Sequence, residues 1–135
     1  MIVMCPDAAM EILLGTIRGK AARSLLLQGE QAIAPKSFSA SIADESHKLF
    51  KQKSVSFEQA TFLITSCRRF VDLIELCDRQ LDDAANLQMK FNLRAYQAQA
   101  LLIARERGAT IYSFDSETIE ACHQLNINCL EEVAI

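Results

Sequence analysis

The sequence predicts one α/β domain in which helices cover a largely parallel sheet. Apolar runs of strand length alternate with helical patterns along the whole chain, as in successive βαβ units. The 135 residues suffice for one hydrophobic core but not for two. Half of the residues are hydrophobic and 23% are charged, a composition that excludes a disordered chain. We therefore expect a single domain over residues 1–135.

The first strand is expected at residues 2–5, because this short apolar run is closed by Pro6. A helix then follows from Asp7, with apolar residues at helical spacing as far as Leu14. Gly15 ends that helix, as glycine commonly does at a helix C-terminus.

A second helix is expected after Gly19, over residues 22–27, and Gly29 ends it. The run 31–34 predicts a short strand closed by Pro35. The next helix is expected to begin near Ser37. Its buried face would carry Phe38, Ile42 and Leu49. Its C-terminal end, where the helix dipole favours cations, would carry Lys48, Lys51 and Lys53.

Ser56 and Gln59 have the spacing of a capping box and predict the start of another helix, which extends to Cys67. The mixed apolar run 71–76 then predicts a strand, and residues 79–91 predict a helix. These elements continue the alternation of strand and helix.

A further helix is expected over residues 95–107, with Gly108 as its C-cap. The run 109–114 is typical of a buried strand. Asp115 follows it, directly before a helix over residues 117–125. The last apolar run contains Cys129, Leu130 and Val133.

Charge and cysteine content exclude several classes of protein. The net charge of −3 divides into +2 over residues 1–53 and −5 over residues 54–135. This balance does not indicate a broad nucleic-acid-binding face, but an acidic domain can still carry a local basic patch. The five cysteines form no CxxC pair, which argues against a disulfide framework or a zinc knuckle. No apolar run has the length of a membrane span, and the N-terminus lacks the features of a signal peptide, so we expect a cytoplasmic protein without membrane contact.

Four segments together resemble the PIN-domain family, whose bacterial members include VapC-type ribonuclease toxins. Residues 2–15 look like the family's first strand, metal-binding position and helix ending in glycine. Residues 41–44 fall where the family has a Glu-Val-Ala-Asn-like segment, and residues 96–98 where it has Tyr-Asp-Ala. Residues 108–115 are similar to its Gly-Ala-x-Leu-Val-Thr-x-Asp stretch. The resemblance implies a three-layer α/β/α domain with about five mostly parallel strands.

The family's four acidic positions correspond here to Cys5, Ser41, Gln97 and Asp115, so only Asp115 keeps a carboxylate. We expect these four residues to meet at the carboxyl edge of the sheet. PIN nucleases use the acidic cluster to hold Mg²⁺ or Mn²⁺, and losing three charges removes most of the metal affinity. The resemblance therefore implies a degenerate PIN-domain protein that has no cofactor and acts by binding.

The alternative to a protein that only binds is one that keeps some ribonuclease activity. Asp7 lies two residues after Cys5, and Glu45 lies one helical turn after Ser41. With Asp115, these acids would hold Mg²⁺ or Mn²⁺ in a residual ribonuclease of the VapC toxin type. Each candidate also has a plain structural role, because Cys5 fits a buried apolar position and Asp115 fits a helix N-cap.

The resemblance also implies partners. PIN-like domains commonly pair through helices, and the high apolar content of this chain favours a homodimer. An antitoxin-like protein and RNA are the other partners that the family suggests.

Overall fold

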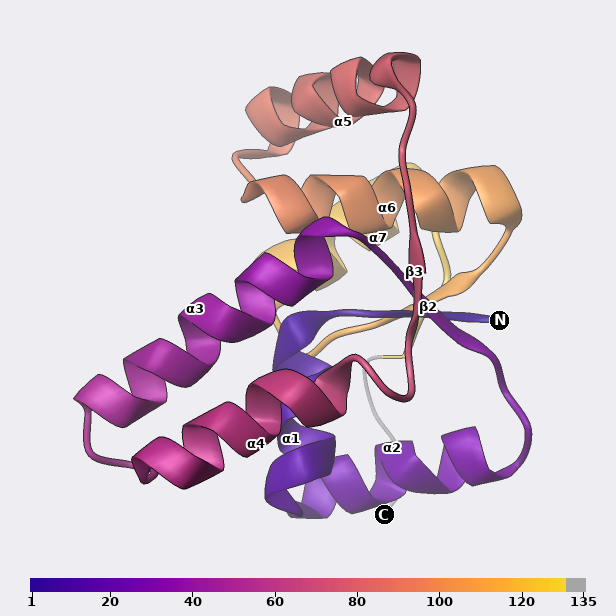
Figure 1. Cartoon of the computed structure of the whole chain (residues 1–135). Coiled ribbons are helices and arrows are strands. Elements are labelled where there is room, and N and C mark those ends of the chain that lie inside the picture. The colour runs from indigo at the N-terminus through magenta and orange to yellow at the C-terminus, as the bar shows by residue number, and fades with distance from the viewer. Residues whose placement is uncertain (131–135) are drawn as a thin grey trace.

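The computed structural model describes residues 1–130, apart from the side chains of Ala22 and Leu25 (Figure 1). Val133, in the last predicted apolar run, lies outside the described residues. The strands are β1 (Ile2–Met4), β2 (Ala32–Pro35), β3 (Asp72–Ile74), β4 (Thr110–Tyr112) and β5 (Cys129–Leu130). The helices are α1 (Pro6–Leu14), α2 (Ile17–Leu27), α3 (Ser37–Lys51), α4 (Phe57–Cys67), α5 (Asp78–Phe91), α6 (Ala95–Arg107) and α7 (Ser116–Leu125).

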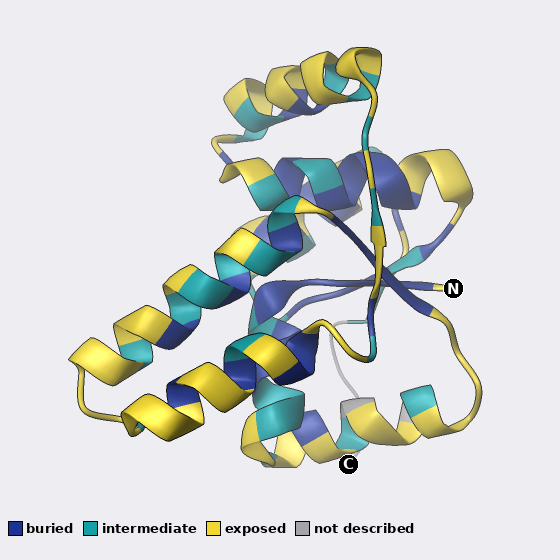
Figure 2. Ribbon diagram, in the orientation of Figure 1, coloured by how far each residue is buried: buried dark blue, intermediate teal, exposed yellow. Residues whose placement is uncertain are grey.

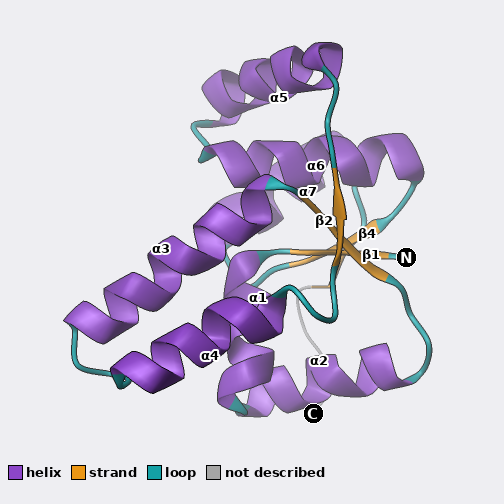
Figure 3. Cartoon of the chain, in the orientation of Figure 1, coloured by secondary structure: helices purple, strands orange, loops and turns teal. Residues whose placement is uncertain are grey.

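The five strands form one parallel sheet in the order β3-β2-β1-β4-β5. β1 is central and pairs with β2 on one side and β4 on the other. Helices lie on both sides of the crossing strands (Figure 3). This is the predicted three-layer α/β/α arrangement with a five-stranded sheet.

The two faces of the sheet carry separate cores because side chains alternate along a strand. Val3 and Ile111 pack on one face with helices α5, α6 and α7. Met4 and Tyr112 pack on the other face with α1, α3 and α4. In Figure 2 the strands β1 and β2 and the inner sides of these helices are buried, whereas the edge strand β3 and the outer sides of the helices are exposed. The central strand β1 is therefore enclosed from both sides.

Several predicted element ends are confirmed. α6 has the predicted bounds, and Gly108 caps it with a φ of 62°. Ser56 and Gln59 form the predicted capping box of α4. Asp115 is the N-cap of α7 and accepts a hydrogen bond from the Thr118 backbone N–H. These ends agree with the sequence because each depends on neighbours within a few residues.

The strand lengths needed correction. The strand expected at 71–76 is limited to Asp72–Ile74, and the one expected at 109–114 is limited to Thr110–Tyr112. The second strand is shifted by one residue and includes Pro35, which pairs with Ile74. The length of each strand depends on the neighbouring strand with which it pairs, and the sequence of one segment does not identify that neighbour.

The start of α2 was predicted wrongly. The helix begins at Ile17 and contains Gly19, which was expected to precede it. Thr16 starts the helix, since its Oγ1 accepts a hydrogen bond from the Gly19 N–H at 3.0 Å. A Cβ atom at Gly19 would overlap the backbone carbonyl of Glu11 in α1. The glycine therefore permits close contact between two helices rather than ending one.

Among the described residues, no helix has the length and apolar character needed to cross a membrane.

The close contact at Gly19 gives a first prediction. In an exposed helix Gly→Ala would stabilise by up to about 1 kcal/mol, but Gly19→Ala should destabilise by roughly 1–3 kcal/mol because the added methyl group forces α1 and α2 apart. Urea denaturation measures the free energy of unfolding. Ser24→Ala, at an exposed position of the same helix, is the control. If Gly19→Ala were as stable as the wild type or more stable, α1 and α2 would not need the close contact at Gly19.

Candidate functional site

The carboxyl ends of β1 and β4 form the place where a doubly wound sheet offers a binding site. The chain leaves β1 towards β2 on one side, and β4 lies on the other side, so the connections diverge at this point. Cys5 follows β1, and Ser113 to Asp115 follow β4. The side chains at this edge define the candidate site.

Asp115 and Gln97 are in direct contact. Gln97 Nε2 donates a hydrogen bond to Asp115 Oδ2 at 2.6 Å, and the same oxygen accepts bonds from the Thr118 N–H at 3.1 Å and hydroxyl at 2.8 Å. Gln97 is only 1% exposed, and its Oε1 accepts the Arg94 N–H at 2.8 Å. The Gln97 amide can make both bonds because its oxygen accepts the Arg94 N–H and its nitrogen donates to Asp115.

Asp7 holds a second carboxylate at the same edge. It accepts hydrogen bonds from the Phe114 N–H at 2.6 Å and from the Ser113 hydroxyl at 3.1 Å. Ser113 Oγ in turn accepts from the Asp115 N–H at 3.1 Å. Burial raises the pKa of Asp7, the bonds from Phe114 and Ser113 offset part of the rise, and the charge of Asp115 adds to it.

Cys5 is a buried thiol beside these carboxylates. The side chain is 1% exposed, and burial, with the nearby charge of Asp7, raises its pKa well above the ordinary value. A thiol whose pKa is raised stays protonated at neutral pH and is a poor nucleophile. Cys5 therefore acts as a buried apolar group at the end of β1.

Ser41 lies on the other side of the site. It lines a cavity of about 330 Å³ together with Glu45, Arg94 and Tyr96. Arg94 Nη1 is 3.9 Å from Glu45 Oε1, and its guanidinium lies 5.3 Å from the centre of the Tyr96 ring. Burial raises the pKa of Tyr96, the charge of Arg94 offsets part of the rise, and the charges of Asp7 and Glu45 add to it.

A further small cleft, of about 230 Å³, is lined by Asp7, Glu11, Arg18, Phe114 and Asp115. The Arg18 guanidinium lies 4.3 Å from the centre of the Phe114 ring and bonds Glu11 Oε1 at 2.8 Å. The sequence analysis did not single out Arg18, because it placed that residue before the second helix. The Thr16 N-cap is the signal that would have located it on α2.

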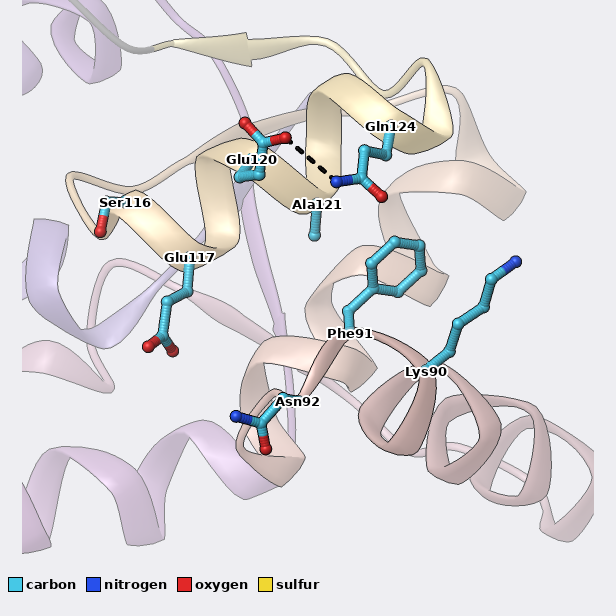
Figure 4. A pocket seen from close by; sticks show the side chains of 8 residues that line it. All are labelled: Lys90, Phe91, Asn92, Ser116, Glu117, Glu120, Ala121 and Gln124. Atoms are coloured by element: carbon cyan, nitrogen blue, oxygen red, sulfur yellow. Dashed lines mark hydrogen bonds between the residues drawn. The ribbon is translucent and has the colours of Figure 1, made fainter.

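A separate cleft of about 470 Å³ lies between the end of α5 and α7 (Figure 4). Phe91 and Gln124 face each other across it, and Gln124 donates a hydrogen bond to Glu120 at 3.0 Å. It shares no lining residue with the cleft that contains Asp7 and Asp115, so it is not part of the candidate site.

The donor set at the edge does not fit a divalent cation. Mg²⁺ held by protein prefers carboxylate oxygens, whereas the four family positions supply one carboxylate, one hydroxyl, one amide and one thiol. The Asp115 Oδ2 atom already receives three hydrogen bonds. In the described part of the chain, no three His, Cys, Asp or Glu side chains are arranged to hold a metal ion. Hydrogen-bond donors occupy the carboxylates in place of a cation.

Comparison with solved structures identifies the fold. PAE2754 from Pyrobaculum aerophilum is 12% identical with a TM-score of 0.71, covering 89% of this chain and 84% of that chain. VapC20 from Mycobacterium tuberculosis, described as a sarcin-ricin loop cleaving toxin, is 14% identical with a TM-score of 0.65, covering 90% and 95%. A chain of a toxin-antitoxin complex from Klebsiella pneumoniae is 12% identical with a TM-score of 0.59, covering 88% and 90%. The chain has a PIN-like fold. No family model and no curated protein sequence matches it.

Within this PIN-like fold, the four family positions are brought together unequally. Gln97 and Asp115 are hydrogen-bonded, and Cys5 is the buried residue that directly follows β1 at the same edge. Ser41 lines the neighbouring cavity together with Tyr96. Of the acids in the alternative metal site, Asp7 and Asp115 share a cleft, whereas Glu45 lies near Arg94.

The raised pKa of Asp7 gives a second prediction. The unfolded chain releases the proton of Asp7 more readily than the folded chain, so this group favours folding at low pH and loses that contribution as pH rises through the folded-state pKa. Between about pH 4 and about pH 7, the wild type should therefore lose stability relative to Asp7→Asn. Urea denaturation at several pH values measures the difference, with the exposed Asp82→Asn as control. A difference that is constant or grows in favour of the wild type would contradict the buried position of the Asp7 carboxylate.

Proposed function

We propose that this chain is a degenerate PIN-like protein that acts by binding a protein or RNA and does not cut RNA by metal-dependent catalysis. The observation that carries the proposal is the bond from the Gln97 amide to Asp115. An acid at position 97 would place two carboxylates against each other, an arrangement that a cation stabilises. The glutamine removes this repulsion and gives Asp115 a donor, so the edge needs no cation for its stability.

The remaining hydrogen bonds support the same proposal. Asp7 is bound to Ser113 and to the Phe114 N–H, and Asp115 is bound to Thr118. A cation at these carboxylates would compete with donors that already stabilise them in the fold. These bonds hold α1, β4 and α7 together at the edge, so their role is structural.

The alternative function is a residual Mg²⁺- or Mn²⁺-dependent ribonuclease of the VapC toxin type. What favours it is the common cleft of Asp7 and Asp115. It also needs Glu45, which lies 3.9 Å from Arg94 and lines the neighbouring cavity. The two functions predict different responses of the protein to added metal, so a metal titration distinguishes them.

For partners, we propose an antitoxin-like protein, on the likeness of the fold to a chain of a toxin-antitoxin complex. We also propose a homodimer. The cytoplasmic location and the absence of a resident cofactor stay predictions.

Metal titration tests the proposed function. Millimolar Mg²⁺ or Mn²⁺ should leave the melting temperature of the wild type unchanged, and the protein should not cleave RNA. The triple variant Cys5→Asp/Ser41→Glu/Gln97→Asp should be less stable without metal, because four carboxylates repel one another. Metal at about 100 times its dissociation constant should restore about 2.7 kcal/mol to this variant.

Gln97→Asp alone is the matched control, because one added charge leaves too few ligands for tight binding. An equal metal response of the wild type and the triple variant would contradict the proposal. Metal-dependent RNA cleavage by the wild type that Asp115→Asn abolishes would establish the alternative.

The homodimer gives a separate prediction. Large apolar side chains remain exposed, including Leu27 at 78% and Met89 at 76%. Exposed apolar surface is favourable to cover, and closed two-fold pairs are the commonest way to do so. Light scattering at high micromolar concentration should give twice the mass of 15.1 kDa. A monomer under these conditions would exclude the pair.

A further inference from the structure

The turn that joins α3 to α4 carries a concentrated positive charge. Residues 48–57 contain three lysines and no acidic residue, whereas the whole chain has a net charge of −3. The other residues therefore carry a net −6. All three lysines, Lys48, Lys51 and Lys53, are exposed. The turn lies at the ends of α3 and α4 that are remote from the sheet (Figure 1). These exposed lysines attract a polyanion.

Two aromatic rings are displayed at the same turn. Phe50 is 41% exposed and Phe57 is 66% exposed, and their ring centres lie 6.1 Å apart in an edge-to-face arrangement. Leu49 and Val55 in the same segment pack instead against the core. Leu49 and Val55 thus provide the contacts of this segment with the core, and the rings of Phe50 and Phe57 remain accessible to a ligand.

The turn is held in one shape by backbone and capping bonds. The Ser54 N–H donates to Leu49 O at 2.9 Å, and the Lys53 N–H donates to Phe50 O at 3.0 Å. The Ser56 N–H donates to Gln59 Oε1 at 2.8 Å, and the Gln59 N–H donates to Ser56 Oγ at 3.1 Å. This capping box fixes the first residue of α4, Phe57. A preformed surface loses little conformational entropy on binding.

We propose that this turn, residues 48–57, is a docking surface for single-stranded RNA. The proposal rests on the proposed function, because it names the surface by which RNA would be bound without being cut. Lysines neutralise backbone phosphates, and an exposed ring stacks on an unpaired base. A duplex offers the phosphates but keeps its bases stacked on each other, so the single strand should bind more tightly.

Charge also determines where on the protein the RNA docks. The edge of the sheet carries Asp7 and Asp115, and the cavity beside it contains Asp44 and Glu45 from the middle of α3. These carboxylates repel phosphates. On α3, Lys48 lies about one turn beyond Asp44 and Glu45, and Lys51 and Lys53 lie at and beyond the end of the helix, so the lysines are farther from the N-terminal end of α3 than these acids are.

Fluorescence anisotropy with a labelled unstructured RNA oligonucleotide tests the proposal. The buffer contains EDTA, so binding is measured without any cleavage. Phe57→Leu should weaken binding at least about fivefold and leave the salt dependence unchanged, because it removes the stacking surface and no charge. Lys48→Gln/Lys51→Gln/Lys53→Gln should reduce the slope of log affinity against log salt by about 2, at about 0.7 per phosphate contact. The matched control Lys20→Gln/Arg23→Gln/Lys90→Gln removes three exposed charges elsewhere and should change the slope less. Thermal melts verify that each variant folds.

Three results would overturn the proposal. The wild type would bind no RNA at low salt, or both turn variants would bind as tightly as the wild type, or the turn variants would lose binding to anionic lipid vesicles while RNA binding stays intact. The last result would assign the turn to a membrane surface instead. Metal-dependent cleavage with normal binding at the turn would overturn the proposed function alone, so the two failures are distinguishable.

Discussion

The need of two partly buried carboxylates, those of Asp7 and Asp115, for hydrogen-bond donors organises the carboxyl edge of this sheet. An unpaired charge in a low-dielectric interior is costly, so each carboxylate must be bound where it is buried. Asp7, at the start of α1, receives the Phe114 N–H and the Ser113 hydroxyl, although more than one hundred residues separate them. Asp115 receives Thr118 and Gln97 and thereby connects α7 to α6. The meeting of three helices with two strands at this edge depends on these bonds.

The same requirement connects stability with the proposed loss of catalysis. In a metal-dependent nuclease the acids at such an edge repel one another until a cation binds, so activity is kept at a cost in stability. Here Gln97 supplies an amide and Cys5 a neutral thiol, and neither adds charge beside Asp115. The proposed function therefore needs no cation to offset repulsion at this edge. A protein of this kind is better suited to presenting surfaces to partners than to activating water.

The carboxyl edge of the sheet carries acidic side chains, and the turn between α3 and α4 carries three lysines. On α3, Asp44 and Glu45 lie near the middle of the helix, and Lys48 and Lys51 belong to its last turn. Opposite charges separated along one helix are also favoured by its dipole, so part of the pattern follows from helix stability alone. The exposed rings of Phe50 and Phe57 do not follow from it, since burial would stabilise them. They are the feature on which the proposed RNA-docking surface rests.

The sequence by itself determined the element order, the bounds of α6, the capping box of α4 and the N-cap role of Asp115, because these depend on contacts within a few residues. It also indicated the PIN-like fold and the positions that face the edge. Only the tertiary structure decided that Gly19 lies inside α2, that Asp7 binds the β4–α7 junction, and that Arg18 lies on Phe114. It also decided that Ser41 and Glu45 line a cavity with Arg94 and Tyr96. These outcomes depend on the packing of segments far apart in the chain, for which periodicity and capping signals contain no information.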